Sequence, residues 1–326
     1  MRNFTFKGLL LTAVFMLLGC LSIQAANDDL ITKQITINLD KAGTLPNKIA
    51  SSEMYKITNL KIIGEINGTD WNMIREMAGR DNRGYGTEGK LSVLDLSEAK
   101  IVKGGDSYYP GDNCYTSNDE IGEKAFTDCS RLTSLTLPVG ITSIGYDAFA
   151  YCSGLTSLTL PAGITSIGEY AFSGCSGLTS LNLPAGITSI DKYAFSGCSR
   201  LTSLTLPAGI TSIGEFAFSY CSGLTSIYVY AEKVPRIGRY AFEGCASRKC
   251  TLYVPKGTYD NYRLSEFGYF ENIVEFDATG IDKTTTSTDV EEVSRYSLNG
   301  QRLAVPVKGL NIVKYSDGSV KKVVVL

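Results

Sequence analysis

The sequence contains no histidine and a single tryptophan among its 326 residues. Without histidine, the Ser-His-Asp and Cys-His groups of many hydrolases are excluded, and so are the histidine ligands of many zinc sites. The formal net charge is only −2, which provides no strong field for attracting nucleic acid. We therefore expect no enzymatic activity, no cofactor, no bound metal and no nucleic-acid partner.

Long apolar runs are also scarce, although apolar residues make up 44% of the chain and are enough to bury a large core. The longest apolar run follows two basic residues at the start of the chain and ends at Cys20. It is too short for a membrane span, so residues 1–26 are typical of a secretory signal. Cleavage near Ala25, which small residues favour, and lipid attachment at Cys20 are both open. We expect a secreted or outer-surface protein that reaches a membrane only through such a lipid anchor.

Cysteine is present but does not follow a disulfide pattern. One set of cysteines recurs at a fixed period of 23 residues, which marks a position in a structural repeat. The favoured interpretation is a small buried side chain at a tight corner, and the alternative is paired or metal-binding thiols. The set comprises Cys129, Cys152, Cys175, Cys198 and Cys221, with Cys245 one residue late.

The rest of the sequence has the same 23-residue period. In the copy 155–177, leucines alternate with Ser and Thr as in a half-buried strand, and Ile164 to Ile167 predicts a second short strand. Residues 169–174 predict a single helical or 3₁₀ turn. Stacked copies align their Leu, Ile, Phe and Cys side chains into one core. The copies start at Leu132, Leu155, Leu178, Leu201 and Leu224, after a divergent copy at Leu91 and an insertion of 18 residues.

The pattern L-T-S-L-x-L-P-x-G-I-T-S-I-G-x-x-A-F-x-x-C-S-x resembles the bacterial BspA-like leucine-rich repeat family. The resemblance implies a leucine-rich-repeat solenoid of the α/β horseshoe class, mainly β with short helical or 3₁₀ turns. It also implies adhesion to a host extracellular-matrix protein or another surface protein. The expected organisation is a signal at 1–26, an N-terminal cap at 27–90, repeats at 91–250, a C-terminal cap at 251–276, a linker at 277–292 and a β tail at 293–326.

The regions outside the repeats carry their own signals. Residues 35–39 and 60–63 predict strands, and Asp70 predicts the N-cap of a helix that runs to about Met77. After the repeats we expect a strand and then a helix that closes the open end. Residues 293–326 contain three strand-like runs with Asn-Gly and Asp-Gly turns, and they resemble the C-terminal β-domains of secreted Bacteroidetes proteins, some of which direct sorting.

Two surface features are candidate partner sites. The insertion at 104–120 has three tyrosines and several acidic residues, which suggests partner contact, a loose calcium site or an ordinary loop. The outward residues of the repeat strands form a face of Ser, Thr and Asn side chains that ends in two tyrosines. The candidate contacts are Tyr108, Tyr109 and Tyr115 in the insertion, and Tyr228 and Tyr230 on the strand face.

An aromatic row precedes the Ala-Phe pair of successive copies. Packing between copies is the favoured interpretation, and contact with a glycan or protein is the alternative. The row consists of Tyr170, Tyr193, Phe216 and Tyr240, with Tyr151 and Tyr220 as further exposed candidates. The Gly84–Gly89 match to G-x-G-x-x-G follows a helix signal instead of a strand, so we interpret it as a loop. Adhesion, a passive surface spacer and glycan capture remain as three functional hypotheses.

Overall fold

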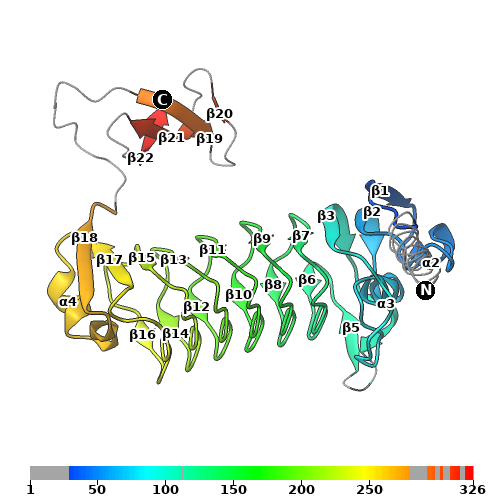
Figure 1. The fold of residues 1–326 in the computed structure, drawn as a ribbon, viewed down its shortest axis with the longest axis horizontal. Coiled ribbons are helices and arrows are strands. Elements are labelled where there is room, and N and C mark those ends of the chain that lie inside the picture. The colour runs from blue at the N-terminus through cyan, green and yellow to red at the C-terminus, as the bar shows by residue number, and fades with distance from the viewer. Residues whose placement is uncertain are drawn as a thin grey trace, which may run out of the picture.

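The computed structural model describes residues 29–109, 111, 113–278, 292–297, 302–303, 309–315 and 320–325. The expected signal and the lipid-attachment candidate Cys20 lie outside these residues, as does most of the expected linker. The main body is an elongated solenoid in which each coil adds one strand to a parallel sheet (Figure 1). Within the described residues, no helix has the length and hydropathy that a membrane span requires.

The first strand of every coil lies along one side of the solenoid. These strands pair in parallel in two five-stranded sheets, with the orders β1-β2-β3-β7-β9 and β11-β13-β15-β17-β18. The bounds in the first sheet are β1 Ile35–Leu39, β2 Asn59–Ile66, β3 Val93–Ile101, β7 Ser134–Thr136 and β9 Ser157–Thr159. In the second sheet they are β11 Ser180–Asn182, β13 Ser203–Leu206, β15 Ser226–Val229, β17 Thr251–Pro255 and β18 Asn272–Phe276.

A second, two-residue strand follows in each coil, as the Ile-Thr-Ser-Ile pattern predicts. Each of these strands also pairs in parallel with its equivalent in the neighbouring coil. They form two three-stranded sheets, β10-β8-β6 and β12-β14-β16. Their bounds are β6 Glu120–Ile121, β8 Ser143–Ile144, β10 Ser166–Ile167, β12 Ser189–Ile190, β14 Ser212–Ile213 and β16 Arg236–Ile237.

The segment after the second strand forms turns, so the prediction of a helical or 3₁₀ turn at 169–174 is wrong. We call residues 168–175 and their equivalents the turn strip. Tyr170 takes a left-handed φ of 56°, which interrupts any right-handed helix. Alternate backbone N–H groups of the turn strip donate to the next coil, as from Phe172 to Ala194 O at 2.7 Å. The turn strip is therefore a third hydrogen-bonded ladder along the solenoid.

The core consists of columns of identical side chains. The Phe column stacks one ring per coil, with centroids 5.0 to 5.5 Å apart from Phe126 to Phe242. Each column cysteine is buried, and from Cys152 to Cys245 the thiol donates to a phenylalanine carbonyl, as from Cys152 Sγ to Phe126 O at 3.0 Å. These contacts confirm the interpretation of Cys as a small buried corner residue.

The N-terminal region closes the first coil with contacts that occur only once. Helix α3, Gly68–Met77, buries Trp71 and Ile74, and the short helix α2 spans Leu45–Lys48. The predicted N-cap at Asp70 is wrong. The N-cap is Asn67, whose side chain accepts from Thr69 N, while the Asp70 carboxylate accepts from the backbone of Asn67 and of the α2 region. Asp70 therefore fixes the entry into α3 from inside the first turn.

The C-terminal end of the solenoid is closed by the predicted strand and helix. Strand β17 is followed by helix α4, Tyr259–Arg263, and by the 3₁₀ helix η2, Glu266–Tyr269, before β18 completes the sheet. Tyr262 is buried and donates to Ala231 O at 2.6 Å. This bond attaches the closing segment to the last coil.

The C-terminal residues form an antiparallel sheet of their own, with the order β20-β19-β21-β22. Three strand-like runs were expected here, and the structure has four strands. Their bounds are β19 Glu292–Ser297, β20 Arg302–Leu303, β21 Gly309–Tyr315 and β22 Val320–Val325.

Candidate functional site

The outward residues of the first strands form one continuous line along the solenoid. The strand registers join Lys61 to Asp95, Asp95 to Thr136, and Thr136 to Thr159. In the second sheet they join Asn182 to Thr205, Thr205 to Tyr228, and Tyr228 to Tyr253. We call this line and the neighbouring outward residues the strand face. Its central part carries small uncharged side chains, as predicted.

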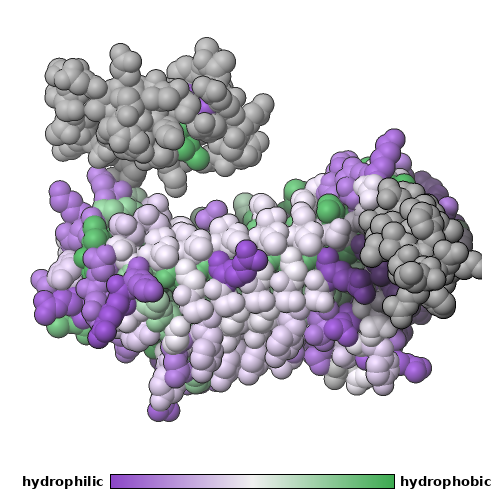
Figure 2. Space-filling model, viewed as in Figure 1, coloured by the Kyte–Doolittle hydropathy of each residue, from purple (hydrophilic) through white to green (hydrophobic). Residues whose placement is uncertain are grey.

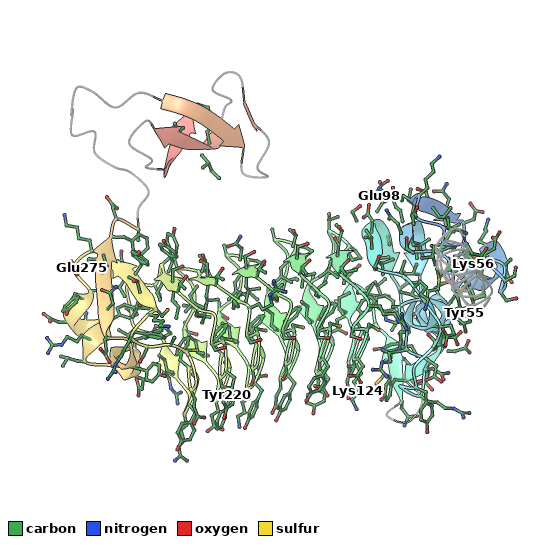
Figure 3. All side chains as sticks on the ribbon, viewed as in Figure 1. Tyr55, Lys56, Glu98, Lys124, Tyr220 and Glu275 are labelled. Atoms are coloured by element: carbon green, nitrogen blue, oxygen red, sulfur yellow. The ribbon has the colours of Figure 1, made fainter. Side chains whose placement is uncertain are left out.

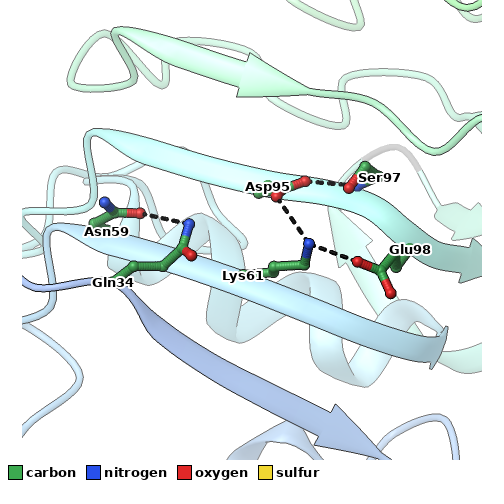
Figure 4. Close-up of polar contacts among 6 residues, drawn as sticks. All are labelled: Gln34, Asn59, Lys61, Asp95, Ser97 and Glu98. Atoms are coloured by element: carbon green, nitrogen blue, oxygen red, sulfur yellow. Dashed lines mark hydrogen bonds and ion pairs between the residues drawn. The ribbon is translucent and has the colours of Figure 1, made fainter.

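The N-terminal end of the strand face carries an ion-paired cluster (Figure 4). Lys61 Nζ lies 2.6 Å from Glu98 Oε1 and 3.3 Å from Asp95 Oδ2. The hydrogen bond to Glu98 is the largest cause of the raised pKa of Lys61. Burial favours a higher pKa for Asp95, but hydrogen bonds from Ser97 and Lys61 outweigh it and lower that pKa. The cluster is internally neutralised apart from one negative charge.

The C-terminal end of the strand face is an aromatic cluster. Tyr228 stacks on Tyr253 with ring centroids 4.4 Å apart and planes 6° apart. Phe276 meets Tyr228 and Tyr230 edge-on, at 6.0 and 5.1 Å. Burial and the neighbouring Tyr253 raise the pKa of Tyr228. The two predicted tyrosines are brought together here, with two partners that the repeat pattern does not indicate.

The space-filling view shows how hydropathy varies between the two ends of the solenoid (Figure 2). The coil surface in Figure 2 is close to neutral in hydropathy, and the hydrophilic residues gather mostly towards the two ends of the solenoid. A partner that lies along the coils therefore meets hydroxyl, methyl and glycine groups. The most hydrophilic side chains on this face lie mostly at the ends (Figure 2).

The predicted aromatic row lies on the turn strip. Tyr170, Tyr193 and Phe216 stack nearly parallel, with ring centroids 4.7 and 4.8 Å apart. Tyr240 continues the row at 5.2 Å, and Tyr146, which was not among the predicted members, meets Tyr170 edge-on at 5.8 Å. Packing between coils, the favoured interpretation, is confirmed. The stacked neighbours cover both faces of Tyr193, so this row presents mainly ring edges and hydroxyl groups to solvent.

A second position on the turn strip also has a left-handed backbone in every coil. We call this position, four residues after the aromatic row, the ridge row. Three of its six members are glycine, but Tyr151 and Tyr220 take φ values of 58° and 56°. A non-glycine residue in this conformation costs ~1–2 kcal/mol. The row consists of Asp128, Tyr151, Gly174, Gly197, Tyr220 and Gly244.

The two ridge tyrosines are the most exposed rings of the coils. Tyr151 is 60% and Tyr220 is 59% exposed, which confirms the prediction of exposure. Tyr220 lies at the lower edge of the coils in Figure 3, away from the first strands. Each ring lies beside the glycine of the next coil, because a Cβ atom at Gly174 would be 2.6 Å from Tyr151 Cδ1 and one at Gly244 would be 2.9 Å from Tyr220 Cδ1.

The insertion is a β-hairpin packed against α3, and only part of the prediction for it holds. Strands β4, Gly104–Tyr109, and β5, Cys114–Thr116, pair antiparallel. Tyr108 as a surface contact is wrong, because its side chain is buried against Trp71 and its hydroxyl donates to Glu123 O at 2.8 Å. Burial raises the pKa of Tyr108.

The other two tyrosines of the hairpin differ from each other. Tyr109 is half-buried and its ring carries two cations, Arg75 Cζ and Lys124 Nζ, each 5.3 Å from the ring centroid. Its ring is therefore not a free contact surface, in contrast to the prediction. Tyr115 is 54% exposed, so it stays a candidate for partner contact. The structure does not bring Tyr115 together with the strand-face tyrosines, since they lie at opposite ends of the repeats.

Chemistry at the remaining candidates is limited. The eight described cysteines are buried, and burial raises the pKa of Cys129 to about 11. In the described part of the chain, no group of three Cys, Asp or Glu side chains is arranged to hold a metal ion, and the insertion provides none. Residues 84–89 form a loop before β3, as predicted.

With this geometry, the protein is a leucine-rich-repeat solenoid. Residues 119–249 match the BspA type leucine rich repeat region in six copies. The repeat region is therefore a BspA-type leucine-rich repeat, which confirms the resemblance of the sequence pattern. No curated protein matches the chain.

Several solved structures are similar in part. A leucine-rich repeat protein of T. pallidum is 32% identical over 40% of this chain and 59% of its own, with a TM-score of 0.38. A leucine-rich cell surface protein of Faecalibacterium prausnitzii is 23% identical over 67% and 51%, with a TM-score of 0.34. A leucine-rich repeat protein of Bacteroides ovatus is 21% identical over 75% and 70%, with a TM-score of 0.32. The chain thus spans between half and three fifths of the first two proteins.

Proposed function

We propose that the protein is an exported, non-enzymatic binding protein that attaches to an extracellular-matrix protein or another surface protein through its strand face. The observation that carries this proposal is the aromatic cluster of Tyr228, Tyr230, Tyr253 and Phe276 at one end of a continuous uncharged face. Tyrosine side chains provide large contact area at low entropy cost and are enriched among binding hot spots. The signal pattern of residues 1–26 supports export.

The arrangement of the strand face suits a partner with an uncharged, extended contact region. Its central side chains are small and short, so they lose little rotamer entropy when a partner covers them. They give little specificity by themselves. The half-buried rings at one end and the Lys61, Asp95 and Glu98 cluster at the other provide the anchoring and orienting contacts.

Solid-phase binding to immobilised fibronectin, collagen and laminin tests the proposal. The double substitution Tyr228→Ser and Tyr230→Ser removes the outward rings, and we expect about tenfold or greater loss of attachment. Tyr115→Ser is the matched control, because Tyr115 is exposed at the far end of the repeats. Circular dichroism confirms that the fold is kept. Equal attachment by wild type and the double variant would contradict the strand-face site.

The near identity of three successive coils supports a second candidate, a passive spacer in a surface coat. A discriminating surface ordinarily varies from coil to coil, whereas Ser157, Ser180 and Ser203 occupy one equivalent position with the same side chain. A spacer predicts that neither matrix proteins nor whole cells retain the purified chain. It also predicts that display of a fused reporter depends on the number of coils.

A further inference from the structure

We propose that the turn strip carries a second binding site, in which Tyr151 and Tyr220 hold a linear, uncharged glycan that runs along the solenoid axis. This site is on a different side of the coils from the strand face, and it stands independently of the function proposed above.

The two tyrosines are not required by the fold. Their position in the coil has a left-handed backbone, and the chain places glycine there in three of six coils. Tyrosine is disfavoured in this conformation. Among the described residues, no other ring stacks on Tyr151 or Tyr220, so the stacking that stabilises the aromatic row does not compensate them. Each ring has the glycine of the next coil as a neighbour but no stacked ring, and a strained residue of this kind points to a role in binding.

The comparison with the aromatic row shows which rings suit a sugar. The faces of Tyr170 and Tyr193 lie against each other at 4.7 Å, so neither shared face can receive a ligand. Sugars pack their C–H faces on an open aromatic face and direct their hydroxyl groups to polar neighbours. Tyr151 and Tyr220, at 60% and 59% exposure, have the open ring surface that this contact needs.

The space between the two rings suits an uncharged chain. The ridge row between them consists of Gly174 and Gly197, and a Cβ atom at Gly197 would meet nothing closer than 3.7 Å. The residues preceding these glycines are Ser173 and Ser196, which carry no charge, and the Ser196 hydroxyl is hydrogen-bonded to that of Ser219 at 2.8 Å. The two glycines and the two serines that precede them carry no charge that could pair with a charged polymer.

The spacing of the rings favours a repeating ligand. Tyr151 and Tyr220 occupy equivalent positions three coils apart, which corresponds to ~14 Å at the ~4.8 Å spacing of neighbouring strands. Each lies beside the glycine of the following coil in the same way. Two equivalent groups of one polymer can therefore contact both rings in the same orientation, and the second contact adds avidity.

Affinity electrophoresis of the purified chain in gels with mannan, xylan, β-glucan or galactan tests this site, with heparin and polygalacturonate as charged probes. We expect at least one uncharged polysaccharide to retard the protein. The double substitution Tyr151→Gly and Tyr220→Gly should weaken that binding by about tenfold or more, and each single substitution by less. Glycine is already present at this position in other coils, so the double variant should remain folded and should unfold at the same or higher urea concentration.

Two further variants sharpen the result. Tyr151→Phe with Tyr220→Phe keeps both rings and should retain most of the affinity. Gly197→Tyr adds a ring between Tyr151 and Tyr220 and should weaken binding by obstructing the ligand, although it removes neither of the two binding rings. The proposal is overturned if no uncharged polysaccharide retards the wild type, if the double glycine variant binds as well as the wild type, or if that variant loses attachment to matrix proteins instead. The Tyr228 and Tyr230 variant should keep its polysaccharide binding, which separates this site from the strand face.

Discussion

The N-terminal cap and the repeat coils bury their side chains in different ways. In the cap, Trp71 donates to Ala125 O at 2.9 Å and Arg75 donates to Lys124 O and Ala125 O at 2.8 and 2.9 Å. Each of these contacts occurs once. In the coils, each contact is repeated in column after column. A single change in the cap therefore removes a contact that nothing else supplies, whereas a condition that acts on one column of side chains acts on every coil at once.

Alkaline pH should have the largest effect on the free energy of unfolding, because it acts on all the buried thiols of the cysteine column. Burial raises the pKa of Cys129 to about 11 from its ordinary value of 9.0, and burial also raises the pKa of Cys152 and Cys175. The folded chain keeps these protons at pH values where the unfolded chain loses them. The resulting stability is fully present below pH 9 and is lost as the pH rises towards 11, by ~3 kcal/mol for Cys129 alone.

Urea unfolding followed by circular dichroism at pH 7, 9, 10 and 11 checks this expectation. Cys175→Ala is the control, because it should make the pH dependence shallower by one proton. A free energy of unfolding that stays constant up to pH 11 would show that the column thiols ionise equally in both states.

Trp71→Ala should be the most destabilising of the single substitutions. It removes a fully buried ring that contacts Phe126 at 5.1 Å and the donor to Ala125 O, so we expect a loss of ~3–5 kcal/mol. Trp71→Phe keeps a ring and should lose much less. Hydrogen exchange locates the damage, and it should appear at α3 and the β4–β5 hairpin. Uniform loss of protection through all coils would contradict a contact that serves only the cap.

Phe→Leu substitutions in the Phe column should lower the free energy of unfolding by less than Trp71→Ala does, and by similar amounts at each position. Phe149, Phe172, Phe195 and Phe218 are each fully buried between two stacked rings, so each change should cost ~1–2 kcal/mol. Because their surroundings are repeated, the four values should agree within ~0.5 kcal/mol. Chemical denaturation of the four variants measures this, and a spread of several kcal/mol would show that the coils are not equivalent.

Glycine substitutions at the left-handed positions of the ridge row and the aromatic row should change the free energy of unfolding least. The two substitutions should differ in sign or size, because only the aromatic row has stacked rings to lose. Tyr220→Gly relieves backbone strain without losing a stacked ring, so we expect a gain of up to ~1 kcal/mol. Tyr193→Gly relieves the same strain but loses two stacking contacts of ~0.5–1.5 kcal/mol each, so its net effect should be near zero or destabilising. Thermal unfolding of the two variants compares them directly, and a larger gain for Tyr193→Gly would refute the stabilising role of the stack.

The repeated part of the fold could be predicted from sequence because the apolar residues that recur with the 23-residue period are the residues of the core. A residue that recurs every 23 positions with an apolar side chain must meet its equivalent in the next coil, as Phe172 does by stacking on Phe149. The turn strip was mispredicted because alternate N–H groups donate to the neighbouring coil instead of continuing a helical turn. A single copy by itself gives no sign of a left-handed tyrosine.

The candidate site was predicted less well, since its geometry depends on contacts made once. Tyr108 and Tyr115 look alike in sequence, and only the packing of the hairpin against α3 buries the first and exposes the second. Tyr253 and Phe276 lie outside the repeats, so the period could not align them with Tyr228. The ridge row could have been found, because Tyr151 and Tyr220 stand where neighbouring copies have glycine.

The hydrogen bonds between successive turn strips have one further consequence, for how the protein can change over evolution. Phe149, Phe172 and Phe195 each donate to the alanine carbonyl of the next coil at 2.7 to 2.8 Å, so the boundaries between these coils are interchangeable. Recombination between copies that removes residues 178–200 would join two matching surfaces. It would bring Tyr151 and Tyr220 closer by one coil, ~4.8 Å, while each ring kept its own neighbouring glycine. The spacing of surface groups can thus vary in whole coils while their local chemistry stays unchanged.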